Sequence, residues 1–179
     1  MLLHQQFIRM AKKHSDKLAI IDRTTDKRVT YSKALIGSLI LSKKFQSYDN
    51  GFLGIMIPTS AGSALATVAA LMSGRIPVMI NYSTGAETNA KYAQQKCKFK
   101  TIITSKALLE KINCPVLDGM VMIEDIMAGI TTGQKITAAL KSKLPVRLLL
   151  NLVHKGDEND TAAIIYTCGS EKDHQAVKL

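Results

Sequence analysis

Residues 52–81 read FLGIMIPTSAGSALATVAALMSGRIPVMIN, and this stretch decides the predicted fold class. Its first six residues form a continuous apolar run that stops at Pro58. Such a run is typical of a strand that is buried on both faces, as in a parallel sheet. Thr59 or Ser60 can cap the helix that follows, which is rich in alanine and leucine. A second apolar strand is expected over 77–80, so the stretch predicts a strand–helix–strand unit.

The same alternation of short apolar runs and helical periods continues on both sides of this unit. Before it, a helix is predicted over 3–14 and a strand hairpin over 18–22 and 28–31. Ser32 is the predicted cap of the next helix, which directs four apolar residues to the core: Leu35, Leu39, Ile40 and Phe45. After it, strands are predicted over 101–104, 120–123 and 161–166, and helices over 87–96 and 106–112. The repeated alternation predicts an α/β domain with a mostly parallel sheet flanked by helices.

Length and composition predict one globular domain over residues 1–179. The chain is 46% hydrophobic and 21% charged, proportions that are typical of a folded domain and not of a disordered segment. No apolar run approaches the roughly 20 residues of a membrane-spanning helix. The N-terminus also lacks the basic and apolar regions of a secretory signal. A cytoplasmic location is therefore the expectation.

The net charge of +10 is compatible with three kinds of partner: nucleic acid, an anionic membrane surface and an acidic protein. Nucleic acid is the weakest of these, because the sequence has no aromatic-interleaved basic stretch, no zinc finger and only 5% aromatic residues. We therefore expect no nucleic-acid binding. Cys97, Cys114 and Cys168 are far apart and odd in number, which argues against a disulfide framework and a zinc site. No metal site is predicted.

Residues 129–154 depart from the strand–helix rhythm. They contain several basic residues and a strongly apolar second half, and no acidic residue occurs between Asp125 and Asp157. Interfacial membrane helices combine these properties. The alternative is an ordinary helix pair that packs on the sheet with its lysines in solvent. We favour the helix pair, because Pro145 interrupts the segment.

The last predicted strand is followed by TCGSEKDHQAV at residues 167–177. Small hydroxylated residues and a glycine after a strand can form a phosphate cradle, since hydroxyls and exposed backbone N–H groups bind anionic oxygens. This pattern is neither a Walker A loop nor the GxGxxG dinucleotide fingerprint. On composition alone, it is a weak signal.

Three segments resemble motifs of the adenylate-forming synthetases. Residues 29–31, VTY, followed by Leu35, resemble the TYxxL start of those enzymes. Residues 69–78, AALMSGRIPV, resemble their early Leu–Gly–Pro segment, and residues 160–171, DTAAIIYTCGSE, resemble the approach to their glycine-rich ATP loop. The resemblance covers essentially the whole chain. It implies that this chain is the N-terminal α/β subdomain of such a synthetase.

A narrower resemblance is carried by residues 77–85, PVMINYSTG, by residues 102–105, IITS, and by Glu124–Asp125. These look like the acyl-acyl carrier protein synthetase half of the bifunctional 2-acylglycerophosphoethanolamine acyltransferases. The resemblance implies an enzyme that joins a fatty acid to ATP and passes the acyl group to a carrier-protein thiol. A linked acyltransferase then uses that acyl group in lysophospholipid reacylation. ATP and Mg²⁺, an acyl carrier protein, a fatty acid and association with the surface of the inner membrane are thus implied for the parent protein.

The resemblance also implies which positions bind the ATP phosphates. They are Thr167, Gly169, Ser170, Glu171, Lys172 and Gln175. Several residues depart from the family pattern: Cys168 stands for a serine, Lys172 for the second glycine, His174 for a proline, Gln175 for a lysine and Ala176 for a glycine. Lys172 can supply the missing positive charge from three positions earlier. Alternatively, the loop is degenerate, and both interpretations stay open.

The chain ends at Leu179, just after this loop, while the family's acyl-pocket, magnesium and lid segments lie further downstream. We therefore assign no catalytic residue, and expect neither ligase turnover nor tight ATP binding from the fragment alone. The alternative function is a non-catalytic basic interaction domain, which docks a carrier protein or anionic lipid and has a degenerate ATP loop.

Overall fold

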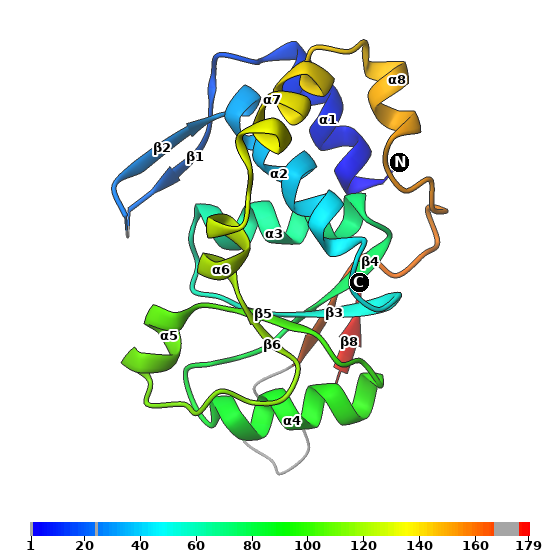
Figure 1. The fold of residues 1–179 in the computed structure, drawn as a ribbon. Coiled ribbons are helices and arrows are strands. Elements are labelled where there is room, and N and C mark those ends of the chain that lie inside the picture. Colours follow the sequence, from blue (N-terminus) through cyan, green and yellow to red (C-terminus); the bar gives the residue numbers. More distant parts are fainter. Residues whose placement is uncertain (1, 24, 167–175) are drawn as a thin grey trace.

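A six-stranded sheet forms the centre of the computed structural model, which describes residues 2–23, 25–166 and 176–179. The strand order is β6-β5-β3-β4-β7-β8 (Figure 1). Five strands run parallel: β3 (Gly51–Met56), β4 (Arg75–Met79), β5 (Ile102–Thr104), β6 (Met120–Met122) and β7 (Ile164–Tyr166). The edge strand β8 (Ala176–Lys178) pairs antiparallel with β7. The predicted α/β class with a mostly parallel sheet is confirmed.

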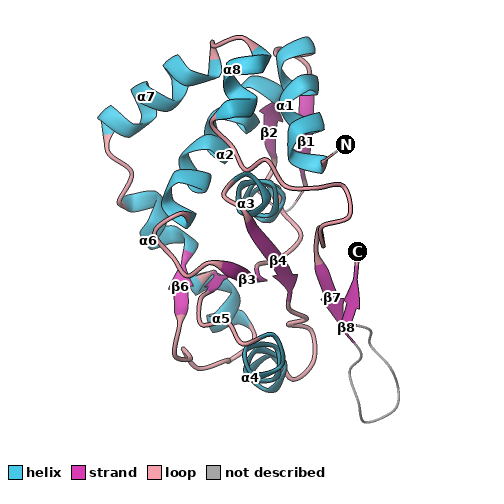
Figure 2. Ribbon diagram, turned by 90° about the vertical axis from the view of Figure 1, so that its right-hand side faces the viewer, coloured by secondary structure: helices cyan, strands magenta, loops and turns pink. Residues whose placement is uncertain are grey.

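Helices cover both faces of the sheet, with one layer on one face and an inner and an outer layer on the other (Figures 1 and 2). One face is covered by α4 (Ala86–Cys97) and α5 (Lys106–Lys111). The other face carries α2 (Tyr31–Phe45), α3 (Ala61–Met72) and α6 (Ile123–Ala128). Beyond these lie α1 (Leu3–Lys13), α7 (Thr132–Ser142) and α8 (Val146–Asn151), which pack on α2, α3 and each other. In the described part of the chain, no helix is long and apolar enough to cross a bilayer.

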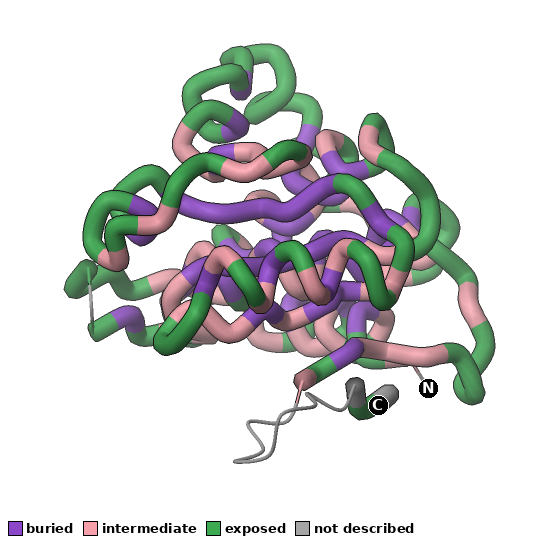
Figure 3. The backbone as a smooth tube through the Cα atoms, turned by 90° about the horizontal axis from the view of Figure 1, so that it is seen from below, coloured by how far each residue is buried: buried purple, intermediate pink, exposed green. Residues whose placement is uncertain are grey.

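The central strand β3 is buried on both faces, as the apolar run predicts. Leu53 and Ile55 pack in the core under α2 and α3, whereas Met56 packs in the core over α4. Buried residues, purple in Figure 3, run along the central strands. Gly54 allows a close approach, because a Cβ at this position would lie 2.8 Å from side-chain atoms of both Phe99 and Ile102. Any larger residue here would force the two neighbours apart.

Several element boundaries differ from the sequence-based expectation, since β4 begins at Arg75 and not at 77, and β7 begins at Ile164 and not at 161. Thr30, and not Ser32, caps α2, because its hydroxyl accepts a hydrogen bond from the Lys33 N–H at 3.4 Å. Ser32 already lies in the first turn and bonds to the Thr30 hydroxyl. For α3, the capping residue is Ser60, one of the two predicted candidates. A short helix, α6, begins at Ile123, the residue at which the sequence predicts the preceding strand to end.

The segment 129–154 forms the favoured helix pair, but it does not pack on the sheet. Its helices α7 and α8 contact α2 and α1. The sheet face was unavailable to them, since α2, α3 and α6 already cover it. Pro145 is the N-cap of α8 and separates the two helices.

A separate hairpin of β1 (Leu18–Asp22) and β2 (Lys27–Thr30) is anchored to the domain by Asp22. The Asp22 side chain is 5% exposed. Its carboxylate accepts hydrogen bonds from the Ala61 N–H at 2.9 Å and the Thr25 N–H at 3.1 Å. Ala61 is the first residue of α3, so this carboxylate also complements the positive end of that helix.

Replacement of this carboxylate tests its role. We expect Asp22→Ala to lower the free energy of unfolding by about 1–3 kcal/mol, because it leaves the buried Ala61 N–H without an acceptor. Urea unfolding followed by circular dichroism measures the change. The exposed Asp49 serves as the control, since Asp49→Ala is expected to change stability by less than about 0.5 kcal/mol. Equal effects of the two substitutions would contradict the anchoring role.

A buried histidine predicts a dependence of stability on pH. The Nε2 atom of His4 lies 2.9 Å from the His154 carbonyl oxygen, and its side chain is 3% exposed. Burial lowers the pKa of His4 below its ordinary value of 6.5, although the hydrogen bond to His154 acts in the opposite direction. Because the unfolded chain takes up this proton at higher pH, the stabilisation is present above pH 6.5 and is lost as the pH falls through the folded pKa.

We therefore expect the free energy of unfolding to fall as the pH is lowered below 6.5. The fall should be smaller in His4→Gln, and chemical unfolding across this range measures it. In the control Gln6→Ala, an exposed position of the same helix that carries no ionisable group, the dependence on pH should stay close to that of the wild type. A His4→Gln variant with the full pH dependence would show that another group is responsible.

Candidate functional site

The chain changes direction within the sheet after β4, and this creates a topological switch point at the carboxyl edge of the strands. From β3 the chain crosses to β4 through α3 on one face, whereas from β4 it returns past β3 to β5 through α4 on the other. It then continues from β5 to β6, so the connections that leave the neighbouring strands β3 and β5 run in opposite directions. In open α/β sheets, ligands bind at such a switch point.

The loop after β4 is held in one conformation at this edge by two asparagines. The Asn81 side-chain oxygen accepts hydrogen bonds from the Ser83 N–H at 2.9 Å and the Ser83 hydroxyl at 2.7 Å. The Asn89 amide donates to the carbonyl oxygens of Asn81 at 3.0 Å and Thr84 at 2.7 Å. Gly85, with φ of 62°, then starts α4. The loop is consequently anchored at both ends, and Ser83 and Thr84 stay exposed.

Strand β7 brings the ends of the predicted phosphate loop to the same edge. It pairs in parallel with β4, in the register Val78↔Ile164. Tyr166 and Ala176 pair across β7 and β8, so both residues that flank 167–175 lie at the carboxyl edge. The predicted phosphate-binding positions themselves lie outside the described residues: Thr167, Gly169, Ser170, Glu171, Lys172 and Gln175. Their roles stay predictions.

The residue immediately before this loop is held by α4. The Tyr166 hydroxyl lies 3.1 Å from the Cys97 sulfur, and the rings of Tyr92 and Tyr166 meet edge to face with centroids 5.7 Å apart. Burial raises the pKa of the Tyr166 phenol, and the hydrogen bond with Cys97 raises it further. The phenol therefore stays protonated. Sequence reasoning missed this cluster, because nothing in the spacing relates Tyr92 and Cys97 to a strand some 70 residues later.

The Glu124–Asp125 pair of the narrower motif buttresses the end of β5. Glu124 accepts hydrogen bonds from the Ser105 hydroxyl at 2.7 Å and the Lys106 N–H at 3.1 Å, and Asp125 pairs with the Lys106 ammonium at 2.5 Å. Burial acts to raise the pKa of Glu124, but these hydrogen bonds outweigh it and hold the pKa below its ordinary value. Both carboxylates are thus engaged in positioning the start of α5, directly after β5.

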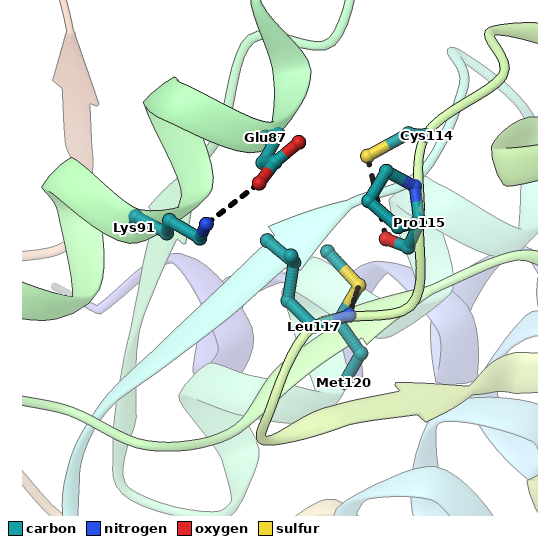
Figure 4. Close-up of polar contacts among 6 residues, drawn as sticks. All are labelled: Glu87, Lys91, Cys114, Pro115, Leu117 and Met120. Carbon is teal, nitrogen blue, oxygen red and sulfur yellow. Dashed lines mark hydrogen bonds and ion pairs between the residues drawn. The ribbon is translucent and has the colours of Figure 1, made fainter.

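Cys114 lies near the N-terminal half of α4, away from the Cys97 end, and it is not an activated thiol. Figure 4 shows it beside Pro115, whose carbonyl oxygen it contacts at 3.5 Å, and across from the Glu87–Lys91 ion pair of 2.6 Å. Burial raises the pKa of the Cys114 thiol, and the negative charge of Glu87 raises it further. A raised pKa disfavours the thiolate that a nucleophile requires.

The described residues at the carboxyl edge of the sheet offer hydroxyl groups for a phosphate but do not by themselves supply a metal site. The exposed hydroxyls of Ser83 and Thr84 lie on the loop beside the strand that leads into residues 167–175. Within the ranges that the structure describes, no group of three or more histidine, cysteine, aspartate or glutamate side chains could hold a metal ion. We therefore assign no magnesium ligand to any described residue.

Comparison with known proteins identifies the kind of domain. A family model described as "AMP-binding enzyme" matches residues 7–171. Three solved structures with the same fold are the inhibitor-bound N-terminal domain of FACL13 from Mycobacterium tuberculosis, the O-succinylbenzoate coenzyme A synthetase MenE from Bacillus subtilis in complex with AMP, and the AMPPNP-bound nonribosomal peptide synthetase FmoA3.

The three proteins resemble this chain in structure more than in sequence. The identities are 17%, 13% and 15%, with TM-scores of 0.70, 0.70 and 0.73, respectively. The matches cover 100%, 96% and 99% of this chain, but only 44%, 41% and 17% of the other chains. The chain thus spans less than half the length of each of the three.

The anchor of the loop can be tested with a double-mutant cycle. We expect Cys97→Ala and Tyr166→Phe each to lower stability, and their effects to be coupled by about 0.5–1.5 kcal/mol, because each removes the same hydrogen bond. Urea unfolding of the two single variants and the double variant measures this coupling. As a control, Cys114→Ala and Tyr166→Phe should be additive within about 0.5 kcal/mol. Additivity of the Cys97 pair would show that the contact contributes nothing.

Proposed function

The chain belongs to the family of AMP-binding enzymes, and on this premise we propose that it is the N-terminal part of an ATP-dependent fatty acyl-[acyl-carrier-protein] synthetase. The parent protein would act with a linked 2-acylglycerophosphoethanolamine acyltransferase in lysophospholipid reacylation. The observation that carries the proposal is the position of Tyr166 and Ala176. These residues bring both ends of a hydroxyl-bearing, glycine-containing segment to the carboxyl edge of the sheet, beside β4.

The proposed reaction has two steps. In the first, the fatty-acid carboxylate attacks the α-phosphorus of ATP, an acyl–O–P bond forms, and pyrophosphate leaves. In the second, the thiolate of the carrier protein attacks the acyl carbon, and AMP leaves with the electron pair of the broken bond. Magnesium would neutralise charge that moves onto the pyrophosphate.

The chain's own contribution would be to hold the polyphosphate. The Thr167 and Ser170 hydroxyls and the backbone at Gly169 would donate hydrogen bonds to phosphate oxygens. Lys172 would supply the positive charge that the neutral Gln175 lacks, and such a charge stabilises a transition state in which negative charge moves onto the leaving group. Cys97 and Tyr166 would position this loop, Asn81 would hold the neighbouring loop after β4, and none of the three would take part in the chemistry.

A second candidate function is a non-catalytic interaction domain that has kept the fold. The substitutions at positions 172 and 175 favour it, because the loop lacks a lysine at its usual place and has a bulky residue where a glycine is expected. The net charge of +10 would suit an acidic carrier protein or an anionic lipid surface. In this case the protein would bind its partner but would not consume ATP.

Exchange between ATP and labelled pyrophosphate distinguishes the two candidates. In the protein encoded by the complete reading frame, we expect exchange that depends on a fatty acid, and we expect none from the 179-residue chain alone. Lys172→Gln should lower the exchange rate by about 10–100-fold, because it removes the proposed charge at the phosphates. Lys111→Gln, on the exposed side of α5, is the matched control and should leave the rate unchanged.

A complete protein that shows no exchange yet binds an acidic carrier protein in a salt-sensitive way would contradict the synthetase and support the interaction domain. A Lys172→Gln variant with the wild-type rate would instead remove Lys172 from the proposed site and leave the synthetase in place.

A further inference from the structure

The outer helices α7 and α8 carry aliphatic side chains that are largely exposed. Ile136 and Leu140 are 56% and 68% exposed, and their spacing places them on one side of α7. Leu148 and Leu152 have the same spacing along the α8 region and are 48% and 45% exposed. The helices meet the domain through other residues, because Ala138, Ser142 and Leu149 are buried. Each helix therefore has two apolar sides, and only one of them is used in packing.

Positive charge accompanies these aliphatic residues. Lys141, Lys143 and Arg147 are exposed and lie between the two pairs in the sequence. Residues 126–156 contain no acidic side chain and no phenylalanine, tyrosine or tryptophan. We name the four aliphatic residues and these three cations the basic–apolar face. Figures 1 and 2 place α7 and α8 at the end of the molecule opposite α4.

A groove continues this face onto α2. It has a volume of about 600 Å³ and lies between α2 and α7. Leu39, Ile40 and Leu152 contribute apolar walls, and Lys43, Lys44 and Lys141 contribute positive charge. Leu152 and Lys141 belong both to the groove and to the basic–apolar face, so the two surfaces are continuous.

We propose that the basic–apolar face docks this domain onto the surface of an anionic phospholipid bilayer. The aliphatic side chains would enter the boundary between headgroups and acyl chains, while the cations would contact lipid phosphates. Each lysine or arginine near such a surface contributes roughly a fivefold increase in affinity.

The composition of the face favours a bilayer over a protein partner. The cores of protein–protein interfaces are depleted of lysine, whereas interfacial membrane helices combine lysine and arginine with leucine. The face carries Lys141 and Lys143 beside leucines, and no acidic residue occurs between 126 and 156. The inference does not depend on the proposed acyl transfer, since bilayer binding needs neither ATP nor residues 167–175.

A single tryptophan reports on insertion, since the natural sequence contains none. We compare Leu140→Trp with Val116→Trp, which lies in the exposed loop between α5 and β6 and is the matched control. Each full-chain variant is mixed with vesicles of phosphatidylglycerol and phosphatidylcholine, or with vesicles of phosphatidylcholine alone. We expect the emission of Leu140→Trp to shift to the blue with the anionic vesicles only. An unchanged emission of Leu140→Trp, or an equal shift of Val116→Trp, would overturn the proposal.

Charge replacement tests the same surface without a probe. The triple variant Lys141→Gln, Lys143→Gln, Arg147→Gln should lower partition onto anionic vesicles about a hundredfold, which is about fivefold for each charge. The control Lys96→Gln, Lys100→Gln, Lys111→Gln removes the same charge from the exposed positions near α4 and α5, and it should lower partition much less. Circular dichroism verifies that both variants are folded.

Three outcomes contradict the bilayer. They are equal losses in the two triple variants, partition that does not weaken as salt rises, and binding of an acidic carrier protein that requires the basic–apolar face while vesicles do not bind. The last result would assign this face to a protein partner. None of these outcomes affects the pyrophosphate-exchange test, so a failure here leaves the proposed synthetase standing.

Discussion

The burial of β3 on both of its faces is the constraint on which the rest of the domain depends. A strand with Leu53 and Ile55 on one side and Met56 on the other has to be covered by helices on both sides. Its parallel neighbours can be reached only through crossover connections, and these connections supply the covering helices. Gly54 completes the arrangement, because it allows Phe99 and Ile102 to approach the strand backbone.

A buried arginine extends this constraint to the ends of two helices. Arg75 begins β4, and its side chain is 7% exposed. Its guanidinium donates to the carbonyl oxygens of Ser73 at 2.6 Å, Gln46 at 3.1 Å and Tyr48 at 2.8 Å. Gln46 and Ser73 are the C-caps of α2 and α3, so the charge sits at the negative ends of both helices. The strand, its two covering helices and the switch point after β4 are thereby held in one unit.

The candidate site follows from this topology more than from any single residue. The connections that leave β3 and β5 run in opposite directions, so the switch point lies at the carboxyl ends of these strands, and β7 follows β4 on the same side of the sheet. The polar groups described at this edge, such as Asn81 and Glu124, are occupied in shaping loops. We therefore propose that residues 167–175 bind the phosphates and that the described residues support them. The outer helices contribute a second kind of surface, in which charge and apolar area coincide.

The sequence by itself determined the fold class, most of the elements and the family. Apolar runs, capping residues and their order are local properties, and they sufficed to place β3, α3 and β4 within a residue or two. The tertiary structure decided what depends on contacts between distant residues. Tyr166 meets Cys97 across 69 positions, and α7 and α8 pack on helices because the sheet face was already covered. Periodicity shows that a residue is apolar or polar, but which neighbour it meets is set by how the layers stack, and no local pattern encodes that choice.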